Sequence, residues 1–185
     1  MHVAGVNASP RISGNTGTLV RAVLAGARAA GAETTLFEMG VLRPGPCRAC
    51  MACKAGAGCA CRDGMRDFYT AAPGLDALVI GTPIYFDHVS GQCKVFIDRL
   101  FAYLHPGLEN HYPGGRRAVL CISYGDDGPG AYDPVLDWME ERLRYYFGFT
   151  VTARLKRHAC AGEVTTAGDA DLLRRAQAAG RAPAE

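Results

Sequence analysis

Five of the eight cysteines in this 185-residue chain lie in one short segment, CRACMACKAGAGCAC. Cys47, Cys50 and Cys53 repeat with two residues between neighbours, and Cys59 follows after five more. Three thiolates at the first spacing can wrap one corner of a [4Fe–4S] cluster, which then needs a fourth ligand from further along the chain. Cys59 can be that ligand, whereas Cys61 is an additional thiol.

Other chemistry suits the same cysteines. Four thiolates also bind zinc, although structural zinc sites more often pair two separated C-x2-C knuckles. A thiol–disulfide switch between Cys50 and Cys53, or between Cys59 and Cys61, is a third interpretation. The fourth is a segment that binds no metal. Spacing alone does not identify a metal, so all four interpretations stay open.

A polar loop, SPRISGNT, lies between an apolar run and a helical pattern near the N-terminus. A loop that opens a helix offers backbone N–H groups and the positive end of the helix dipole to a phosphate. The sequence contains neither G-x-x-x-x-G-K-[ST] nor G-x-G-x-x-G, so neither a nucleoside triphosphate loop nor a Rossmann turn is expected. A single terminal phosphate would suit the donors of this loop, which are the Ser9, Ser13 and Thr16 hydroxyls, the Asn15 amide and the Arg11 guanidinium. The alternative is a polar loop that only caps the helix.

A second loop, GTPIYFDHVS, follows the most apolar run of the chain. A planar ring needs flat apolar surface and backbone polar groups at its edge. Pro83, Ile84, Tyr85 and Phe86 can supply both, and His88 could donate a hydrogen bond there. The alternative is that the two aromatic side chains cover the sheet or an oligomer interface.

Composition and charge exclude several classes of protein. The chain is 49% hydrophobic and 21% charged, as is usual for a globular protein, and its net charge of +2 is too small to indicate nucleic acid or an anionic membrane as a partner. The N-terminus does not resemble a signal peptide, and no apolar run approaches the roughly 20 residues of a membrane helix. We therefore expect a cytoplasmic protein whose thiols stay reduced.

Strand-like and helix-like patterns alternate along the chain. The expected strands cover 3–6, 34–37, 75–82, 118–123 and 149–155. The first expected helix follows the polar loop, and others cover 65–71 and 169–179. Two more begin after Ser90 and after Asp133, which are expected to be their N-caps. This alternation predicts one α/β domain over residues 1–185, a three-layer sandwich with a five-stranded parallel sheet in the order 2-1-3-4-5. In that order both loops meet where the strand order reverses.

Three blocks of the sequence resemble one known family. They are SPRISGNTGTLV, the cysteine segment with the RDGM that follows it, and GTPIYFDHVSGQCKVFIDR. Together they are similar to the NADPH-dependent FMN reductase family of flavodoxin-like proteins, and in particular to its iron–sulfur flavoprotein branch. The blocks span most of residues 3–100. The remainder matches only in its element pattern and in Gly162-Glu163.

The resemblance implies roles for individual residues. The FMN phosphate would be held by Ser9, Arg11, Ser13, Asn15 and Thr16. The isoalloxazine ring would be held by Pro83, Ile84, Tyr85 and Phe86 and approached by Ser123, Tyr124 and Gly125. Residues that match the family's helix motif read as structural or interface residues, namely Lys94, Asp98 and Arg99. The chain departs from the family in Asp63-Gly64-Met65, in Cys61 and in Cys93.

The resemblance also implies an activity. FMN carries its own redox chemistry, so no acid–base pair is required of the protein. NAD(P)H would reduce the flavin, and a quinone, a free flavin or another small acceptor would take the electrons, with a [4Fe–4S] cluster as a relay beside FMN. The alternative is an electron-transfer protein that works with ferredoxin and has no small substrate. A flavin-free metal or thiol sensor is the third class. A homodimer or homotetramer is expected.

Two remaining features have simpler interpretations. The basic stretch 154–158 could attract a pyridine-nucleotide phosphate, but charge runs of this kind usually form an exposed strand face. Cys121 and Cys160 lie in or near expected strands and read as small core residues.

Overall fold

The computed structural model describes residues 1–56, 58–160 and 166–181. Gly162 and Glu163, which contributed to the family resemblance, lie outside the described residues. Five parallel strands form the sheet: β1 (His2–Asn7), β2 (Glu33–Glu38), β3 (Ala77–Tyr85), β5 (Arg117–Ser123) and β6 (Thr150–Arg157). Their order is β2-β1-β3-β5-β6, and the short strand β4 (His88–Val89) pairs antiparallel with β3. The predicted order of the five main strands is therefore confirmed.

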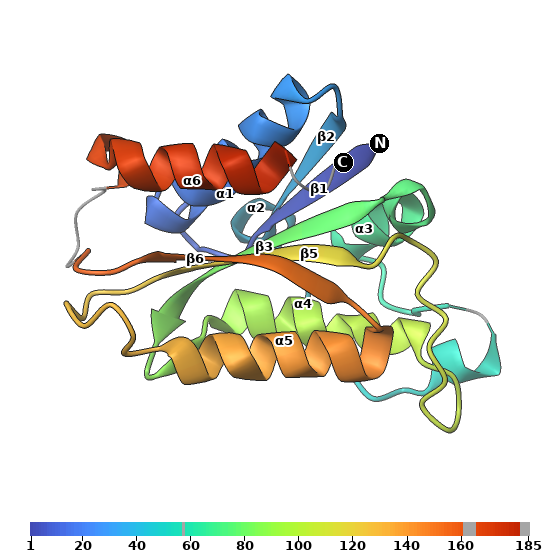
Figure 1. Ribbon diagram of the computed structural model, residues 1–185. Helices are drawn as coiled ribbons and strands as arrows, with labels where there is room; N and C mark the ends of the chain where they lie inside the picture. Colours follow the sequence, from blue (N-terminus) through green and yellow to red (C-terminus); the bar gives the residue numbers. More distant parts are fainter. Residues whose placement is uncertain (57, 161–165, 182–185) are drawn as a thin grey trace.

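Helices cover both faces of the sheet (Figure 1). The helices α1 (Asn15–Ala29) and α6 (Ala170–Arg181) lie on one face, and α4 (Gly91–Arg99) and α5 (Asp133–Phe147) lie on the other. The shorter helices are α2 (Met39–Leu42) and α3 (Met65–Ala71). Side chains alternate across the strands, so each face has its own core. In β3, Leu78 and Ile80 pack towards the α4–α5 side, whereas Ala77 and Val79 pack towards the α1–α6 side.

The helix ends agree with most of the sequence signals. Ser90 caps α4 by accepting a hydrogen bond from the Cys93 N–H at 3.1 Å. Gly148 ends α5 with φ of 71°, the left-handed conformation that glycine adopts without strain. The expected N-cap of α5 is wrong by one residue, because Tyr132 holds that position and makes no side-chain cap bond. The Asp133 carboxylate instead pairs with Lys156 Nζ at 2.7 Å.

The second predicted loop is not a loop along its whole length. The strand expected at 75–82 runs on to Tyr85, so Pro83 and Ile84 belong to β3. The short strand β4, which sequence patterning does not predict, turns back along its end. This extension carries the aromatic residues beyond the carboxyl edge of the sheet.

The described part of the cysteine segment contains little regular structure. One 3-10 turn, Ala52–Ala55, interrupts it, and further single turns lie at Ala72–Gly74, Leu100–Tyr103 and Thr166–Gly168. Among the described residues, no helix is both long and apolar enough to cross a membrane.

Candidate flavin site and cysteine segment

The first loop joins β1 to α1 at the carboxyl edge of the sheet. Ser9 and Thr16 are buried there, whereas Arg11 and Ser13 are exposed. Gly14 is the N-cap of α1; in the described part of the chain it makes no side-chain cap bond, and the first turn carries no acidic residue. The first turn of α1 therefore places no carboxylate of its own at the positive end of the helix dipole, which suits an anion.

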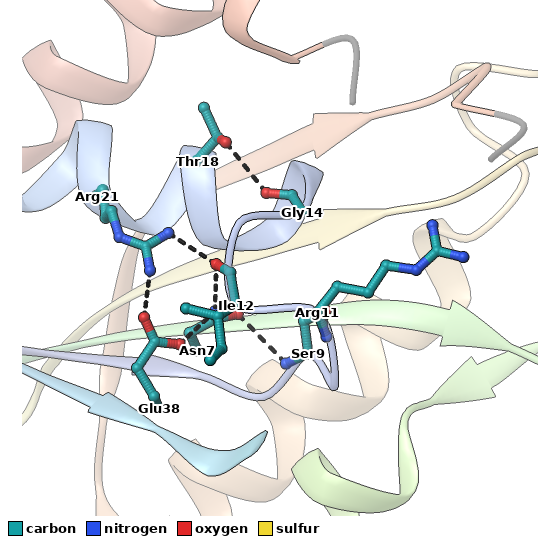
Figure 2. A network of polar contacts seen from close by, with 8 residues as sticks. All are labelled: Asn7, Ser9, Arg11, Ile12, Gly14, Thr18, Arg21 and Glu38. Atoms are coloured by element: carbon teal, nitrogen blue, oxygen red, sulfur yellow. Dashed lines mark hydrogen bonds and ion pairs between the residues drawn. The ribbon is translucent and has the colours of Figure 1, made fainter. Parts of the chain in front are cut away.

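A network behind the loop fixes its shape (Figure 2). Arg21 pairs with Glu38 and also donates to the Ile12 carbonyl at 2.9 Å. Asn7 donates to Glu38 Oε2 at 2.6 Å and accepts from the Ser9 N–H at 3.2 Å. The Arg11 side chain points away from this network.

Gly17 allows α1 to approach the loop closely. A Cβ on Gly17 would lie 2.4 Å from the Ile12 carbonyl oxygen and 2.8 Å from Asn7 Nδ2. Real side chains do not tolerate such contacts, so glycine is required here for packing and not for backbone freedom. The loop around Ile12 and the first turn of α1 are thereby held as one unit.

The second segment ends in a strained turn. Tyr85 and His88 pair across a two-residue hairpin whose central residues, Phe86 and Asp87, have φ of 47° and 60°. Type I′ turns need positive φ at both positions and usually use Asn-Gly, so this turn costs about 1–2 kcal/mol per residue. Tyr85 is 46% exposed and Phe86 is fully exposed. Non-glycine residues in this conformation concentrate at functional sites.

Hydrogen bonds join the first loop to the two segments beside it. Ser90 Oγ donates to the Ala8 carbonyl at 2.6 Å, and the Ser90 N–H donates to Thr82 Oγ1 at 3.0 Å. Thr16 Oγ1 and Ser123 Oγ, both buried, lie 2.6 Å apart. The structure therefore brings together the ends of β1, β3 and β5, as the strand order predicts.

Other predicted site residues have partners inside the protein. Asn15 Oδ1 accepts from the N–H and the hydroxyl of Thr166 at 2.9 and 2.8 Å. Tyr124 is buried, and its hydroxyl donates to the carbonyls of Gly128 and Pro129. Gly125 is exposed beside it. The structure thus places Tyr124 as a support of the β5 end and leaves Gly125 at the surface.

Sequence reasoning missed several residues that shape this edge. They are Asn7, Arg21, Glu38, Thr82 and Tyr132. A signal existed for Thr82, because a hydroxyl in an otherwise apolar strand must find a partner. The Arg21–Glu38 pair left no comparable signal. Arg21 lies in α1 and Glu38 ends β2, and the sequence alone does not show that these two positions come together in the fold.

The cysteine segment is fastened to the far end of α4. Arg99 is buried and holds Asp63 through two hydrogen bonds, of 2.7 and 3.1 Å. Its guanidinium also donates to the Gly45 carbonyl at 2.8 Å and to Cys59 Sγ at 3.3 Å. Lys54 Nζ donates to the carbonyls of Phe101 and Leu104 and lies 3.6 Å from the Phe101 ring centroid. Arg99 therefore has a definite structural role, as the helix motif suggests.

Helix α4 separates this segment from the two loops that are predicted to bind flavin. Ser90 begins α4 at the carboxyl edge of the sheet, and Arg99 ends it at the cysteines. Nine residues at about 1.5 Å per residue give roughly 13 Å between these two ends. The cluster relay beside FMN that the resemblance implies stays a prediction, and it would have to pass electrons along the length of α4. Loop order along the sequence does not reveal which end of a helix a segment packs against.

The cysteines converge without forming a closed ligand set. Each of the eight is a free thiol, and Cys47, Cys50, Cys53, Cys59 and Cys61 all line one small hollow of about 20 Å³. Within the described part of the chain, no three Cys, His, Asp or Glu side chains stand close enough together to hold one metal ion. The donors suit a cluster in type and number, and the segment must close further to ligate one.

Local electrostatics favour the thiolate at one of these positions. Partial burial raises the pKa of Cys59, but hydrogen bonds from the Cys61 backbone and from Arg99, together with the Arg99 charge, outweigh it and leave the pKa below its usual value. In contrast, burial raises the pKa of Cys93 to about 12 and also raises that of Cys121. Cys121 is a core residue as predicted, whereas Cys160 is only half-buried.

The basic stretch is already neutralised by acidic side chains. Arg154 pairs with Asp137 and Glu140, Lys156 pairs with Asp133, and Arg157 pairs with Asp169. These pairs support the interpretation of an exposed strand face over that of an anion site.

Comparisons with known proteins agree with this arrangement. The model of the NADPH-dependent FMN reductase family matches residues 1–139. An iron–sulfur flavoprotein of Archaeoglobus fulgidus is 29% identical over 96% of this chain and 76% of its own length. An FMN-dependent NADH:quinone oxidoreductase of Methylocella silvestris is 38% identical over 40% of this chain and 39% of its own.

A solved structure shares the fold. The NAD(P)H:quinone oxidoreductase from Methanothermobacter marburgensis superposes with a TM-score of 0.75 at 19% identity, covering 98% of this chain and 94% of its own. The flavodoxin-like architecture predicted from the sequence is confirmed. With three quarters of its length matched by the family model, the chain belongs to the NADPH-dependent FMN reductase family.

Proposed function

We propose that the protein binds FMN at the carboxyl edge of its sheet and oxidises NADH or NADPH, passing electrons to a quinone, a free flavin or another small acceptor. The observation that carries this proposal is the junction of the β1, β3 and β5 ends, held by the Thr16–Ser123 and Ser90–Ala8 hydrogen bonds. The names of the relatives support the same chemistry.

The residues present suit FMN. The N-terminus of α1, where Gly14 supplies no side-chain cap, offers donors and positive charge to a phosphate together with Ser9, Ser13 and Arg11. Pro83, Ile84, Tyr85 and Phe86 offer apolar surface to the ring. Bound FMN would supply the acceptance of a hydride and the release of one or two electrons. The protein would bind and orient it, and the aromatic turn would exclude water from one side.

Anaerobic titration tests this function. Protein reconstituted with FMN should lose its flavin absorption on addition of NADH or NADPH and regain it with a quinone. Indifference to both nucleotides contradicts the oxidoreductase proposal. A colourless protein without affinity for FMN would instead support the sensor alternative.

We further propose a [4Fe–4S] cluster held by Cys47, Cys50, Cys53 and Cys59. Support comes from the shared hollow, from the Arg99 hydrogen bond to Cys59 and from the relatives named iron–sulfur flavoproteins. Anaerobically prepared protein should contain about four irons per chain. Cys59→Ser should lose this iron, whereas Cys61→Ser should keep it. Iron-free wild-type protein, or equal loss in both variants, contradicts this ligand set.

One observation favours a second function. Cys47 and Cys50 are exposed at the end of α4 that lies away from the flavin loops, where another protein can reach them. An electron-transfer protein that exchanges electrons with ferredoxin would use such a surface. Reduction by ferredoxin, with no reduction by NADH or NADPH, would select this function over the first.

We propose a homodimer or homotetramer on the basis of an apolar groove. It lies between the cysteine segment, α4 and α5 and has a volume of about 490 Å³. Its lining includes Ile97, Phe101, Leu104, Trp138 and Phe147. Large exposed apolar surfaces usually serve association. Light scattering of the purified protein measures its oligomeric state. A protein that is monomeric at all concentrations contradicts the proposed oligomer.

A further inference from the structure

The Phe86–Asp87 turn adopts a conformation that its residues do not favour. Both have positive φ, and neither is glycine or asparagine. The two β-ladder pairs that flank the turn, Ile84–Val89 and Tyr85–His88, form a very short hairpin, and short isolated hairpins have little stability of their own. Contacts from elsewhere in the fold must therefore hold the turn in place.

Those contacts come from the start of α5. Tyr132, the N-cap residue of that helix, donates its hydroxyl to Asp87 Oδ1 at 3.0 Å. One and a half turns further on, the Trp138 ring packs edge-on against the His88 ring with centroids 4.7 Å apart. The turn is thus fastened at its tip and at its returning strand to one rigid helix.

Tyr132 also contacts the end of β5. Its ring packs edge-on against Tyr124 with centroids 4.9 Å apart. The hydrogen bond to Asp87 raises the pKa of the Tyr132 phenol, so the group stays protonated and remains a donor. Tyr132 therefore bridges the aromatic turn and the β5 end, the two segments proposed to meet the flavin ring.

We propose that Tyr132 is a positioning residue, which acts through Asp87 to hold Tyr85 and Phe86 against the flavin ring. This inference rests on the proposed FMN site, where the flavin ring would give the exposed Phe86 an apolar partner. The hydrogen bond from the Tyr132 hydroxyl to Asp87 is called the latch below. The Tyr132 ring contributes separately, by packing on Tyr124. The two contributions can be separated by mutation.

Three variants isolate the latch. Tyr132→Phe removes the hydroxyl and keeps the ring. Asp87→Asn keeps an acceptor oxygen and a side chain that tolerates positive φ, so this variant should retain most of the wild-type behaviour. Tyr145→Phe makes the same chemical change as the first variant on the same helix, at a side chain that is 68% exposed, and is the matched control.

The first measurement needs no cofactor. Hydrogen exchange of residues 83–90 in the FMN-free protein should be faster in Tyr132→Phe than in the wild type and in Tyr145→Phe. Trp138 is the single tryptophan of the chain and touches His88, so its emission reports the same release. The emission of Tyr132→Phe should differ from that of the wild type, whereas Tyr145→Phe should match it.

The second measurement uses FMN. Loss of one hydrogen bond of ordinary strength should weaken FMN binding about three- to tenfold in Tyr132→Phe. The absorption bands of bound flavin should shift, because the ring loses a fixed aromatic neighbour. Asp87→Asn should bind FMN with nearly wild-type affinity and spectrum.

The outcomes are distinct. If residues 83–90 exchange no faster in Tyr132→Phe than in Tyr145→Phe, the latch does not exist. If they exchange faster but the FMN affinity and spectrum of Tyr132→Phe are unchanged, the positioning role is wrong. Wild-type protein that fails to bind FMN overturns the proposed function and the positioning role together. The exchange comparison would then still decide whether the latch itself exists.

Discussion

Arg99 places a positive charge where the protein admits almost no water, since its side chain is only 1% exposed. The charge is compensated by the Asp63 carboxylate, and further hydrogen bonds go to Gly45 and Cys59. Buried ion pairs add little to stability compared with an apolar replacement of both partners, but the removal of one partner is costly. Arg99 therefore ties the cysteine segment to α4 in a way that single mutations can measure.

Arg99→Met should lower the free energy of unfolding by about 3 kcal/mol, because it leaves the Asp63 carboxylate without its charge partner. Urea unfolding measures the change. Lys94→Met is the matched control on the same helix, since the Lys94–Asp98 pair is roughly half exposed and such pairs contribute under about 1 kcal/mol. Equal effects of the two substitutions contradict the assigned role of Arg99.

The Asp63–Arg99 pair also makes stability depend on pH. The Arg99 hydrogen bonds hold the pKa of Asp63 below its usual value, against the effect of burial. Because the folded pKa is depressed, the stabilisation is complete above the unfolded value of about 4 and is lost as the pH falls through the folded value. Between pH 6 and roughly pH 3, the wild type should therefore lose more stability than Asp63→Asn. Parallel curves from urea unfolding at several pH values contradict this.

At the scale of elements, α4 sets the distance between the two candidate redox regions. Its first residues are held to the β1–α1 loop through Ser90, and its last residue is held to the cysteine segment. The other side of the candidate flavin site depends on α1, whose close approach to the first loop requires Gly17. Both helices begin at the carboxyl edge of the sheet.

Gly17→Ala should push the first loop away from α1, because its Cβ would meet the Ile12 carbonyl oxygen at 2.4 Å. FMN affinity, measured by fluorescence titration, should fall by at least about tenfold, a loss of roughly 1.4 kcal/mol that is within the usual cost of overpacking. Gly91→Ala at the start of α4 is the control, since nothing lies within 4 Å of the added Cβ. Unchanged affinity in Gly17→Ala would show that the loop does not hold the phosphate.

The elements differ in how far the sequence could predict them. The buried strands and amphipathic helices follow hydrophobic periodicity, so their order and the strand order could be predicted. The β3–β4 hairpin could not, because Phe-Asp carries no turn signal and is held by Tyr132 and Trp138 from a distant helix. The candidate site followed from the strand order, whereas the place of the cysteines did not, since it depends on Arg99 at the far end of α4.

At the scale of the whole molecule, the two sides of the sheet have different tasks. The α4–α5 side carries the groove and meets the cysteine segment. The α1–α6 side carries a backbone contact between two helices, where a Cβ on Gly26 would lie 1.9 Å from the Gln177 carbonyl oxygen. A Cβ on Gly180 would lie equally close to the Val23 carbonyl oxygen. These two glycines let α6 lie directly on α1.

Gly26→Ala should therefore separate α6 from α1 and lower the free energy of unfolding by about 2 kcal/mol or more. Gly168→Ala, where an added Cβ meets nothing within 4 Å, should change it little. Urea unfolding compares the two. If Gly26→Ala is as stable as the control, the close contact between the helices is not important for stability.

The α1–α6 contact has a consequence for the order of events during protein synthesis. Helix α1, which follows the first loop, is among the first elements to leave the ribosome, whereas the helix that covers it, α6, spans residues 170–181. Thr166, which holds Asn15, also emerges late. A nascent chain therefore presents the uncovered side of α1 until residues 166–181 have emerged, so we expect the flavin to be loaded only after α6 has packed on α1.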